Sequence, residues 1–169
     1  MKAVLISIQP KWCELIASGK KTIEVRKSVP KLNRPFKCYI YCTIGNGVKG
    51  DYLVPSGIQC GKVIGEFVCR GVMDGGSKLL PKQSCLTLEE IWEYAKGKTV
   101  YGWRIADLKI YDKPKELSEF YRQCPEYYSS YEDGICAEAC IWYEFGECKN
   151  FCLPITRPPQ SWCYVEVEE

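Results

Sequence analysis

Lys21, Glu24 and Arg26 lie close together near the N-terminus, in the stretch GKKTIEVR over residues 19–26. Lys21 and Arg26 can bind phosphate or carbonyl oxygens, lysine as a point charge and arginine as a planar fork. Glu24 can accept a hydrogen bond from an exocyclic amine or a ribose hydroxyl. If the stretch is a strand, alternation places Thr22 on the same face as Glu24 and Arg26. We therefore take Lys21, Thr22, Glu24 and Arg26 as candidate ligand-binding residues.

A simpler interpretation of the same residues stays open. Glu24 and Arg26 are two positions apart on one strand face, and they could form a surface ion pair worth only a few tenths of a kcal/mol. In that case the charged face looks outward into solvent, while Ile23 and Val25 pack on the opposite face.

The elements that must position these residues follow from hydrophobic periodicity and from breaker residues. Pro10 suits the first position of a helix, Gly19 suits its end, and Thr87 with Glu90 forms a capping box for a later helix. Pro114 also suits a helix start. The expected strands are residues 2–8, 22–25, 36–43, 61–72, 101–110 and 161–167, and the expected helices are residues 10–17, a segment from about 86, and 114–121. This pattern predicts an α+β fold on a small β-barrel of about six strands with two or three short helices.

Composition limits the function classes. The 169 residues suffice for one domain, 1–169, and they include 12 cysteines but no histidine. The absence of histidine excludes Ser-His and Cys-His nucleophile pairs. No run of eighteen apolar residues and no signal-peptide pattern is present, so we expect a cytoplasmic protein that does not engage a membrane.

The charge is unevenly distributed. Residues 11–37 hold eight Lys/Arg against two Glu, a net charge of +6, whereas residues 111–169 hold five Lys/Arg against twelve Asp/Glu, a net charge of −7. This asymmetry favours an anionic partner near the N-terminal third. The overall charge of +2 argues against a dedicated duplex binder with a broad basic face.

The pattern G-x-K-x-x-E-x-R at residues 19–26, directly after an expected strand and helix, resembles the signature of the ASCH domain family. The resemblance extends to YGWRI at residues 101–105, to DLKI at residues 107–110 with Pro114, and to RPPQSW at residues 157–162. These segments are similar to small bacterial and prophage-borne members. The resemblance covers about residues 1–122 and 153–169, with a Cys-rich insertion at about 123–152.

The resemblance implies a PUA-like β-barrel whose cleft accepts a nucleobase, a nucleotide or an RNA segment. Single-stranded RNA is read by stacking and by base-edge hydrogen bonds, so Trp12, Trp103 and Trp162 are candidate platforms, although most tryptophans in a domain of this size fill cores. Gln160 and Ser161 of the terminal motif join the candidate ligand-binding set. The first hypothesis is an RNA- or nucleotide-binding module without a cofactor.

Some family members are amidohydrolases that deacylate modified cytidine, which implies an alternative function. They use a motif Lys, a Thr three residues later and a Glu from a downstream loop. Lys21 matches the Lys, but Glu24 replaces the Thr, and residues 82–86 (KQSCL) offer no carboxylate. A Lys21–Glu24 acid/base pair could still act on a substrate such as N4-acetylcytidine.

The insertion carries a separate hypothesis. Cys136, Cys140, Cys148 and Cys152 form two C-x3-C pairs that could supply four thiolates to a structural zinc ion, with free thiols or disulfides as alternatives. A further alternative is that the insertion is the working surface of a protein-interaction adaptor. The remaining cysteines fall mostly at strand or helix positions and are expected to behave as small hydrophobes.

Overall fold

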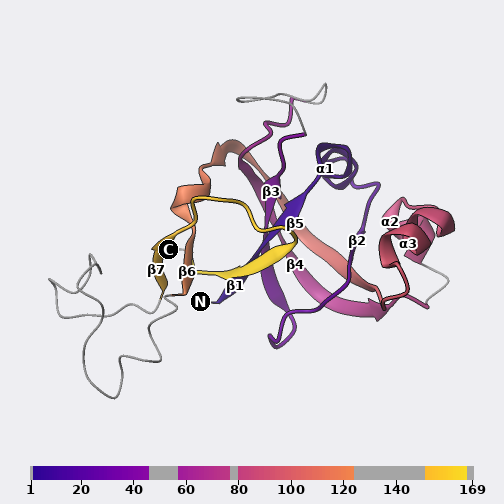
Figure 1. The fold of residues 1–169 in the computed structure, drawn as a ribbon. Helices are drawn as coiled ribbons and strands as arrows, with labels where there is room; N and C mark the ends of the chain where they lie inside the picture. The colour runs from indigo at the N-terminus through magenta and orange to yellow at the C-terminus, as the bar shows by residue number, and fades with distance from the viewer. Residues whose placement is uncertain (1, 46–56, 77–79, 124–150, 167–169) are drawn as a thin grey trace, which may run out of the picture.

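The computed structural model describes residues 2–45, 57–76, 80–123 and 151–166. A curled six-stranded sheet forms the body of the molecule (Figure 1). Its order is β2-β5-β4-β3-β1-β8, with β1 and β3 parallel and the other neighbours antiparallel. The strands are β1 (Ala3–Ile8), β2 (Ile23–Arg26), β3 (Phe36–Cys42), β4 (Val63–Asp74), β5 (Tyr101–Lys115) and β8 (Trp162–Val165). A separate pair consists of β6 (Tyr121–Gln123) and β7 (Phe151–Pro154). The expected α+β fold of about six strands with few short helices is confirmed, and its sheet is curled into a half-barrel.

Three short helices and one 3-10 turn accompany the sheet: α1 (Pro10–Ala17), α2 (Leu80–Ser84), α3 (Leu88–Ala95) and η1 (Leu117–Glu119). Pro10 begins α1, and Gly19 follows its end with a φ of 73°, a backbone conformation that glycine adopts without strain. The capping box of α3 is present, with Thr87 and Glu90 bonded in both directions. These features confirm the predicted starts of α1 and α3 and the predicted end of α1. The sequence reading missed α2.

The main core fills the concave side of the curled sheet, and α1 closes it. β1, β3 and β4 contribute fully buried aliphatic side chains, and Cys13 and Ile16 point in from α1. A second cluster covers the other side of β1 and β3, where Phe120 and Ile155 pack against Tyr39. Because β1 is buried on both sides, all six of its residues are buried, as its nearly continuous apolar sequence indicates.

The predicted helix at residues 114–121 is wrong. Pro114 lies inside β5, and the helical turn that follows this strand is the three-residue η1. Between the pairs Gly65↔Ile110 and Val63↔Lys115 the register of β4 and β5 shifts. Pro114 falls in this irregular part of the strand, where the missing N–H removes no regular ladder hydrogen bond.

Strand β2 buries both of its faces. Ile23 and Val25 pack with Ile91 of α3 and with Val100, as predicted. The other face does not look outward, since Glu24 is only 5% exposed. The interpretation of Glu24 and Arg26 as a solvated surface pair is therefore wrong.

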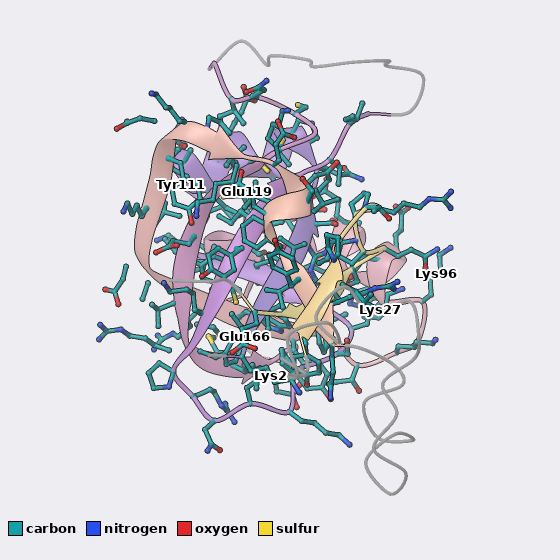
Figure 2. All side chains as sticks on the ribbon, turned by 90° about the vertical axis from the view of Figure 1, so that its left-hand side faces the viewer. Lys2, Lys27, Lys96, Tyr111, Glu119 and Glu166 are labelled. Carbon is teal, nitrogen blue, oxygen red and sulfur yellow. The ribbon has the colours of Figure 1, made fainter. Side chains whose placement is uncertain are left out.

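Charged side chains are spread over different sides of the body. Figure 2 shows Lys27 and Lys96 on one side of the molecule, with Tyr111 and Glu119 on the opposite side. Lys27 Nζ lies 4.7 Å from the ring centroid of Tyr94, which belongs to α3. The basic side chains of Lys27 and Lys96 therefore lie near β2 and α3.

Candidate functional site

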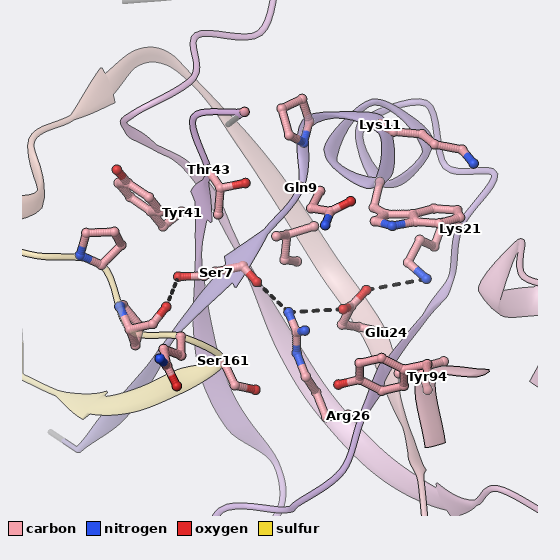
Figure 3. Close-up of a pocket in the computed structure, with 18 of the residues that line it drawn as sticks. Ser7, Gln9, Lys11, Lys21, Glu24, Arg26, Tyr41, Thr43, Tyr94 and Ser161 are labelled. Carbon is pink, nitrogen blue, oxygen red and sulfur yellow. Dashed lines mark hydrogen bonds and ion pairs between the residues drawn. The ribbon is translucent and has the colours of Figure 1, made fainter. Parts of the chain in front are cut away.

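A cavity of about 970 Å³ opens between α1, β2 and the segment at residues 158–161 (Figure 3). Its polar floor comes from Lys21, Glu24 and Arg26, and Ser7 adds to it at the end of β1. The loop after β3 contributes Thr43 to the rim. The cavity therefore lies where β1, α1, β2 and the C-terminal segment meet, and it includes charged residues of the stretch 19–26.

Lys21, Glu24 and Arg26 form one continuous ion-paired group. Lys21 Nζ is 3.3 Å from Glu24 Oε2, and an Arg26 terminal nitrogen is 3.1 Å from Glu24 Oε1. The side chains are 2%, 6% and 11% exposed for Lys21, Glu24 and Arg26, respectively. Such low exposure means that each charge is held by protein partners rather than by bulk water.

Backbone carbonyls fix the two cations of this group. Lys21 Nζ donates to the carbonyl of Ser84 at 2.7 Å, and Arg26 donates to the carbonyl of Ser7 at 2.6 Å. The Ser7 hydroxyl in turn donates to the carbonyl of Pro159 at 2.6 Å. The group is thus tied to α2, to β1 and to the C-terminal segment, so its geometry is set by three distant parts of the chain.

Two buried polar atoms of the group lack a hydrogen-bond partner among the described residues. They are Glu24 Oε2, which faces Lys21 without hydrogen-bond geometry, and Arg26 Nε. A buried donor and acceptor without partners cost free energy. Both residues line the cavity, but these two atoms are themselves buried, so a ligand that offers one group of each kind reaches them only when the side chains that cover them shift.

The walls of the cavity are aromatic and amphipathic. Trp12, Tyr41 and Tyr94 line it, and the Trp12 ring centroid lies 4.4 Å from Lys11 Nζ and 5.1 Å from Lys21 Nζ. Amide side chains come from Gln9 and Gln160. A flat, polar-edged ligand can therefore meet ring faces on the walls and charged groups on the floor.

The structure brings together six of the nine residues predicted to bind a ligand or to stack on it. Lys21, Glu24, Arg26, Trp12, Gln160 and Ser161 all line the cavity.

Thr22, Trp103 and Trp162 do not line it. Thr22 is exposed and lies just before β2, where its backbone bonds to Gln83 and Ile105. Trp103 is fully buried in the core, in a T-shaped contact with Phe36 at a centroid distance of 5.7 Å, so it is not a stacking platform. Trp162 packs against Trp103 at a centroid distance of 5.9 Å, and its indole N–H donates to the Ser28 hydroxyl at 3.0 Å.

Several residues that line the cavity were not predicted from the sequence, notably Ser7, Gln9, Tyr41, Thr43 and Tyr94. Ser7 carried a usable signal, because it is the one hydroxyl in the otherwise aliphatic strand AVLISI. The others come from elements far apart in the chain, and no local pattern marks them.

Three of the predicted zinc ligands, Cys136, Cys140 and Cys148, lie outside the described residues, and of Cys152 only its backbone in β7 is described. The zinc site and the adaptor surface of the insertion therefore stay predictions. Within the described ranges, no group of three or more Cys, Asp or Glu side chains could hold a metal ion. No helix in that part of the chain is long and apolar enough to cross a membrane.

A curled PUA-like sheet with a charged cavity beside its second strand defines the class of this protein. The ASCH domain model matches residues 6–145, and the chain belongs to the ASCH domain family. No curated protein matches the sequence.

Solved structures of ASCH from Zymomonas mobilis share the fold. The crystal structure of the Zymomonas mobilis protein superimposes with a TM-score of 0.58 at 18% identity, and the match covers 97% of the present chain and 87% of the Zymomonas chain. A tyrosine-to-phenylalanine variant of the same protein gives the same TM-score and identity, with 98% and 91% of the two chains covered. At this identity the likeness speaks for the fold alone.

Proposed function

We propose that this ASCH domain binds RNA or a nucleotide in the cavity above Lys21, Glu24 and Arg26. The observation that carries the proposal is the pair of partnerless buried atoms, Glu24 Oε2 and Arg26 Nε, in a cavity with aromatic walls. A nucleobase edge presents a donor and an acceptor side by side, and its ring can stack on an aromatic side chain. Family membership agrees with this ligand class.

The charges of the floor also suit such a ligand. Two cations and one carboxylate leave a net positive charge, and Lys11 adds another cation at the wall. Phosphate or carbonyl oxygens are attracted to this charge, whereas Glu24 selects a ligand that also brings a hydrogen-bond donor. A ligand with phosphates but no base would leave Glu24 unsatisfied.

Binding of a fluorescent single-stranded RNA, measured by anisotropy and by competition with nucleosides and nucleotides, tests the proposal. Arg26→Gln should weaken binding about tenfold or more, because it removes a charge-assisted hydrogen bond. Gln160→Ala changes an exposed residue of the cavity and should weaken binding without disturbing the ion-paired group. Affinity should fall as salt rises.

Arg70→Ala is the matched control. It also removes one positive charge, but from an exposed pair between Arg70 on β4 and Asp107 on β5, outside the cavity. Its affinity should stay within about twofold of the unmodified protein, since a distant exposed charge is screened. Arg26→Gln and Gln160→Ala that both bind as tightly as the unmodified protein, or equal losses of affinity in all three variants, would contradict the proposal.

A second candidate function rests on the contact between Lys21 and Glu24. A buried lysine 3.3 Å from a carboxylate is a workable acid/base couple for hydrolysing the amide of an acylated nucleoside. Helix α2, which precedes α3, lies beside Lys21, but it supplies the Ser84 carbonyl and not a carboxylate. Incubation with N4-acetylcytidine separates the two functions, because hydrolysis releases cytidine and acetate, whereas a binding module returns the compound unchanged.

A further inference from the structure

Three cysteines meet behind the wall of the cavity. Cys13 lies on α1, Cys42 ends β3, and Cys60 lies in the turn that leads to β4. All three residues are fully buried. The sulfur atoms of Cys42 and Cys60 are 3.5 Å apart, which is van der Waals contact for two thiols.

The backbone holds Cys42 and Cys60 side by side. The Gly61 N–H donates to the carbonyl of Cys42 at 2.8 Å, and the Cys42 N–H donates to the carbonyl of Lys62 at 2.9 Å. These two hydrogen bonds fix the end of β3 against the turn before β4. The contact between the sulfurs is therefore set by sheet geometry and not by a chance side-chain rotamer.

The thiols differ in acidity. Hydrogen bonding with Cys13 lowers the pKa of Cys42, burial opposes this effect, and hydrogen bonding with Cys60 lowers the pKa further. Burial, followed by its contacts with Cys42, raises the pKa of Cys60 to about 12. Because the thiolate is the reactive form, Cys42 is the nucleophile of the pair, and Cys60 keeps its proton until a second step.

The pair lies a short way beneath the cavity surface. Ile44 lines the cavity and is 38% exposed. It also covers the turn after Cys60, since a Cβ added at Gly61 would come within 3.1 Å of Ile44 Cδ1. A small oxidant needs local opening to reach the two buried sulfurs, and Ile44 is the exposed side chain of the cavity that lies next to their turn.

We propose that Cys42 and Cys60 are a modification site, which a hydroperoxide converts into a disulfide. The Cys42 thiolate attacks one peroxide oxygen, the O–O bond breaks, and Cys42 becomes a sulfenic acid while hydroxide leaves and takes up the proton that Cys42 released. The Cys60 sulfur then attacks the Cys42 sulfur, and the S–O bond breaks. The leaving hydroxide takes the Cys60 proton and departs as water, so that two thiols and hydrogen peroxide yield one disulfide and two waters.

The disulfide acts on the cavity wall. The two sulfurs must approach from 3.5 Å to about 2.0 Å, so the new bond reorients both side chains and draws the end of β3 and the turn before β4 toward each other. Thr43 and Ile44 follow Cys42 directly and line the cavity. Oxidation therefore adjusts one edge of the site.

Native, fully reduced protein treated with hydrogen peroxide, then alkylated and mapped by mass spectrometry without reduction, tests the proposal. A cross-linked peptide pair joining Cys42 to Cys60 should form early in the titration. Cys38 and Cys69 are the matched control within the same chain, because they are buried strand cysteines whose pKa values are both raised by burial. These two should remain alkylatable after unfolding when the Cys42–Cys60 link is complete.

The order of the two steps distinguishes this mechanism from random oxidation. Cys60→Ala should leave a Cys42 sulfenic acid that dimedone traps, or a link from Cys42 to Cys13, whereas Cys42→Ala should leave Cys60 unoxidised. Melting curves establish that both variants are folded, and the mapping of the unmodified protein needs no variant. Oxidation of Cys38 and Cys69 before Cys42, or equal oxidation of Cys60 in Cys42→Ala, would overturn the proposal. Neither result depends on whether RNA binds.

Discussion

Glu24 has two roles in the cavity. It pairs with two cations at once, and one of its oxygens still has no hydrogen-bond partner among the described residues. A group that is buried but incompletely satisfied adds little stability, and its cost is acceptable where a ligand completes it. The residue types were readable from the sequence, but their burial was not, because alternation distinguishes two faces of a strand without telling what covers each face.

Ile23 tests the assignment of the strand faces. Ile23→Ala should lower the free energy of unfolding by about 2–4 kcal/mol, because the side chain is 1% exposed and packs with Ile91 and Val100. Urea denaturation measures this change. The matched control is Thr22→Ala, one position earlier and exposed, which should change stability by less than about 0.5 kcal/mol. A loss at Ile23 as small as that at Thr22 would show that the faces are reversed.

The capping box of α3 shows how local sequence positions one wall of the site. Thr87 accepts from the N–H of Glu90, and the Glu90 carboxylate accepts from the N–H of Thr87. The helix that they start carries Tyr94 into the cavity wall and Ile91 onto β2. Starts of this kind were predictable, because their signals are contained within four residues.

Thr87→Ala should therefore destabilise the protein by about 1 kcal/mol, the usual cost of losing an N-cap side chain. Thr87→Ser keeps the hydroxyl and should recover most of the loss. Thermal melts of both variants make the comparison. If Ala and Ser behaved alike, the capping contact would contribute nothing to stability.

The pairing of β4 with β5 carries a pH-dependent contact. Tyr111 donates to Glu66 at 2.5 Å, and Lys37 lies 3.4 Å from the same carboxylate. Burial acts to raise the pKa of Glu66, but the hydrogen bond from Tyr111 and the charge of Lys37 outweigh it and lower the pKa below 4.5. A lowered carboxylate pKa stabilises the fold above the unfolded-state value, and this contribution is lost as the pH falls through the folded-state value.

Tyr111→Phe should consequently destabilise the protein at neutral pH, and the difference from the unmodified protein should shrink as the pH falls below about 4.5. Urea denaturation at a series of pH values measures it. In a Glu66→Gln background the same change should give a difference that does not vary across this range. A difference independent of pH in both backgrounds would rule out the carboxylate as its source.

Across the whole molecule, more of the fold than of the site was predictable from the sequence. Periodicity located the strands of the main sheet, and the motif at residues 19–26 located the floor of the cavity. What local patterns could not supply is the set of tertiary partners: Ser84 on Lys21, Ser7 on Arg26, and the burial of Trp103. Pro114 misled for a related reason, since only the register shift between β4 and β5 allows a proline inside that strand.

The charge asymmetry acquires a location in the fold. The basic residues of the N-terminal third include Lys11, Lys21 and Arg26, which share one cavity. A ligand attracted by this third of the chain arrives at the site itself. This agrees with binding of a single nucleotide or a short single strand and not with a flat interface to duplex.

Ultraviolet cross-linking of a single-stranded RNA to the native protein, with the attached residues mapped by mass spectrometry, tests whether the cavity is the binding site. Trp92 is an internal control, since it is 79% exposed on α3 and lies outside the cavity. We expect attachment at Trp12, Tyr41 or Tyr94, and we expect it to fall at least several-fold in Arg26→Gln. Attachment at Trp92 with none at the cavity aromatics, unchanged in Arg26→Gln, would contradict the assignment of the cavity as the binding site.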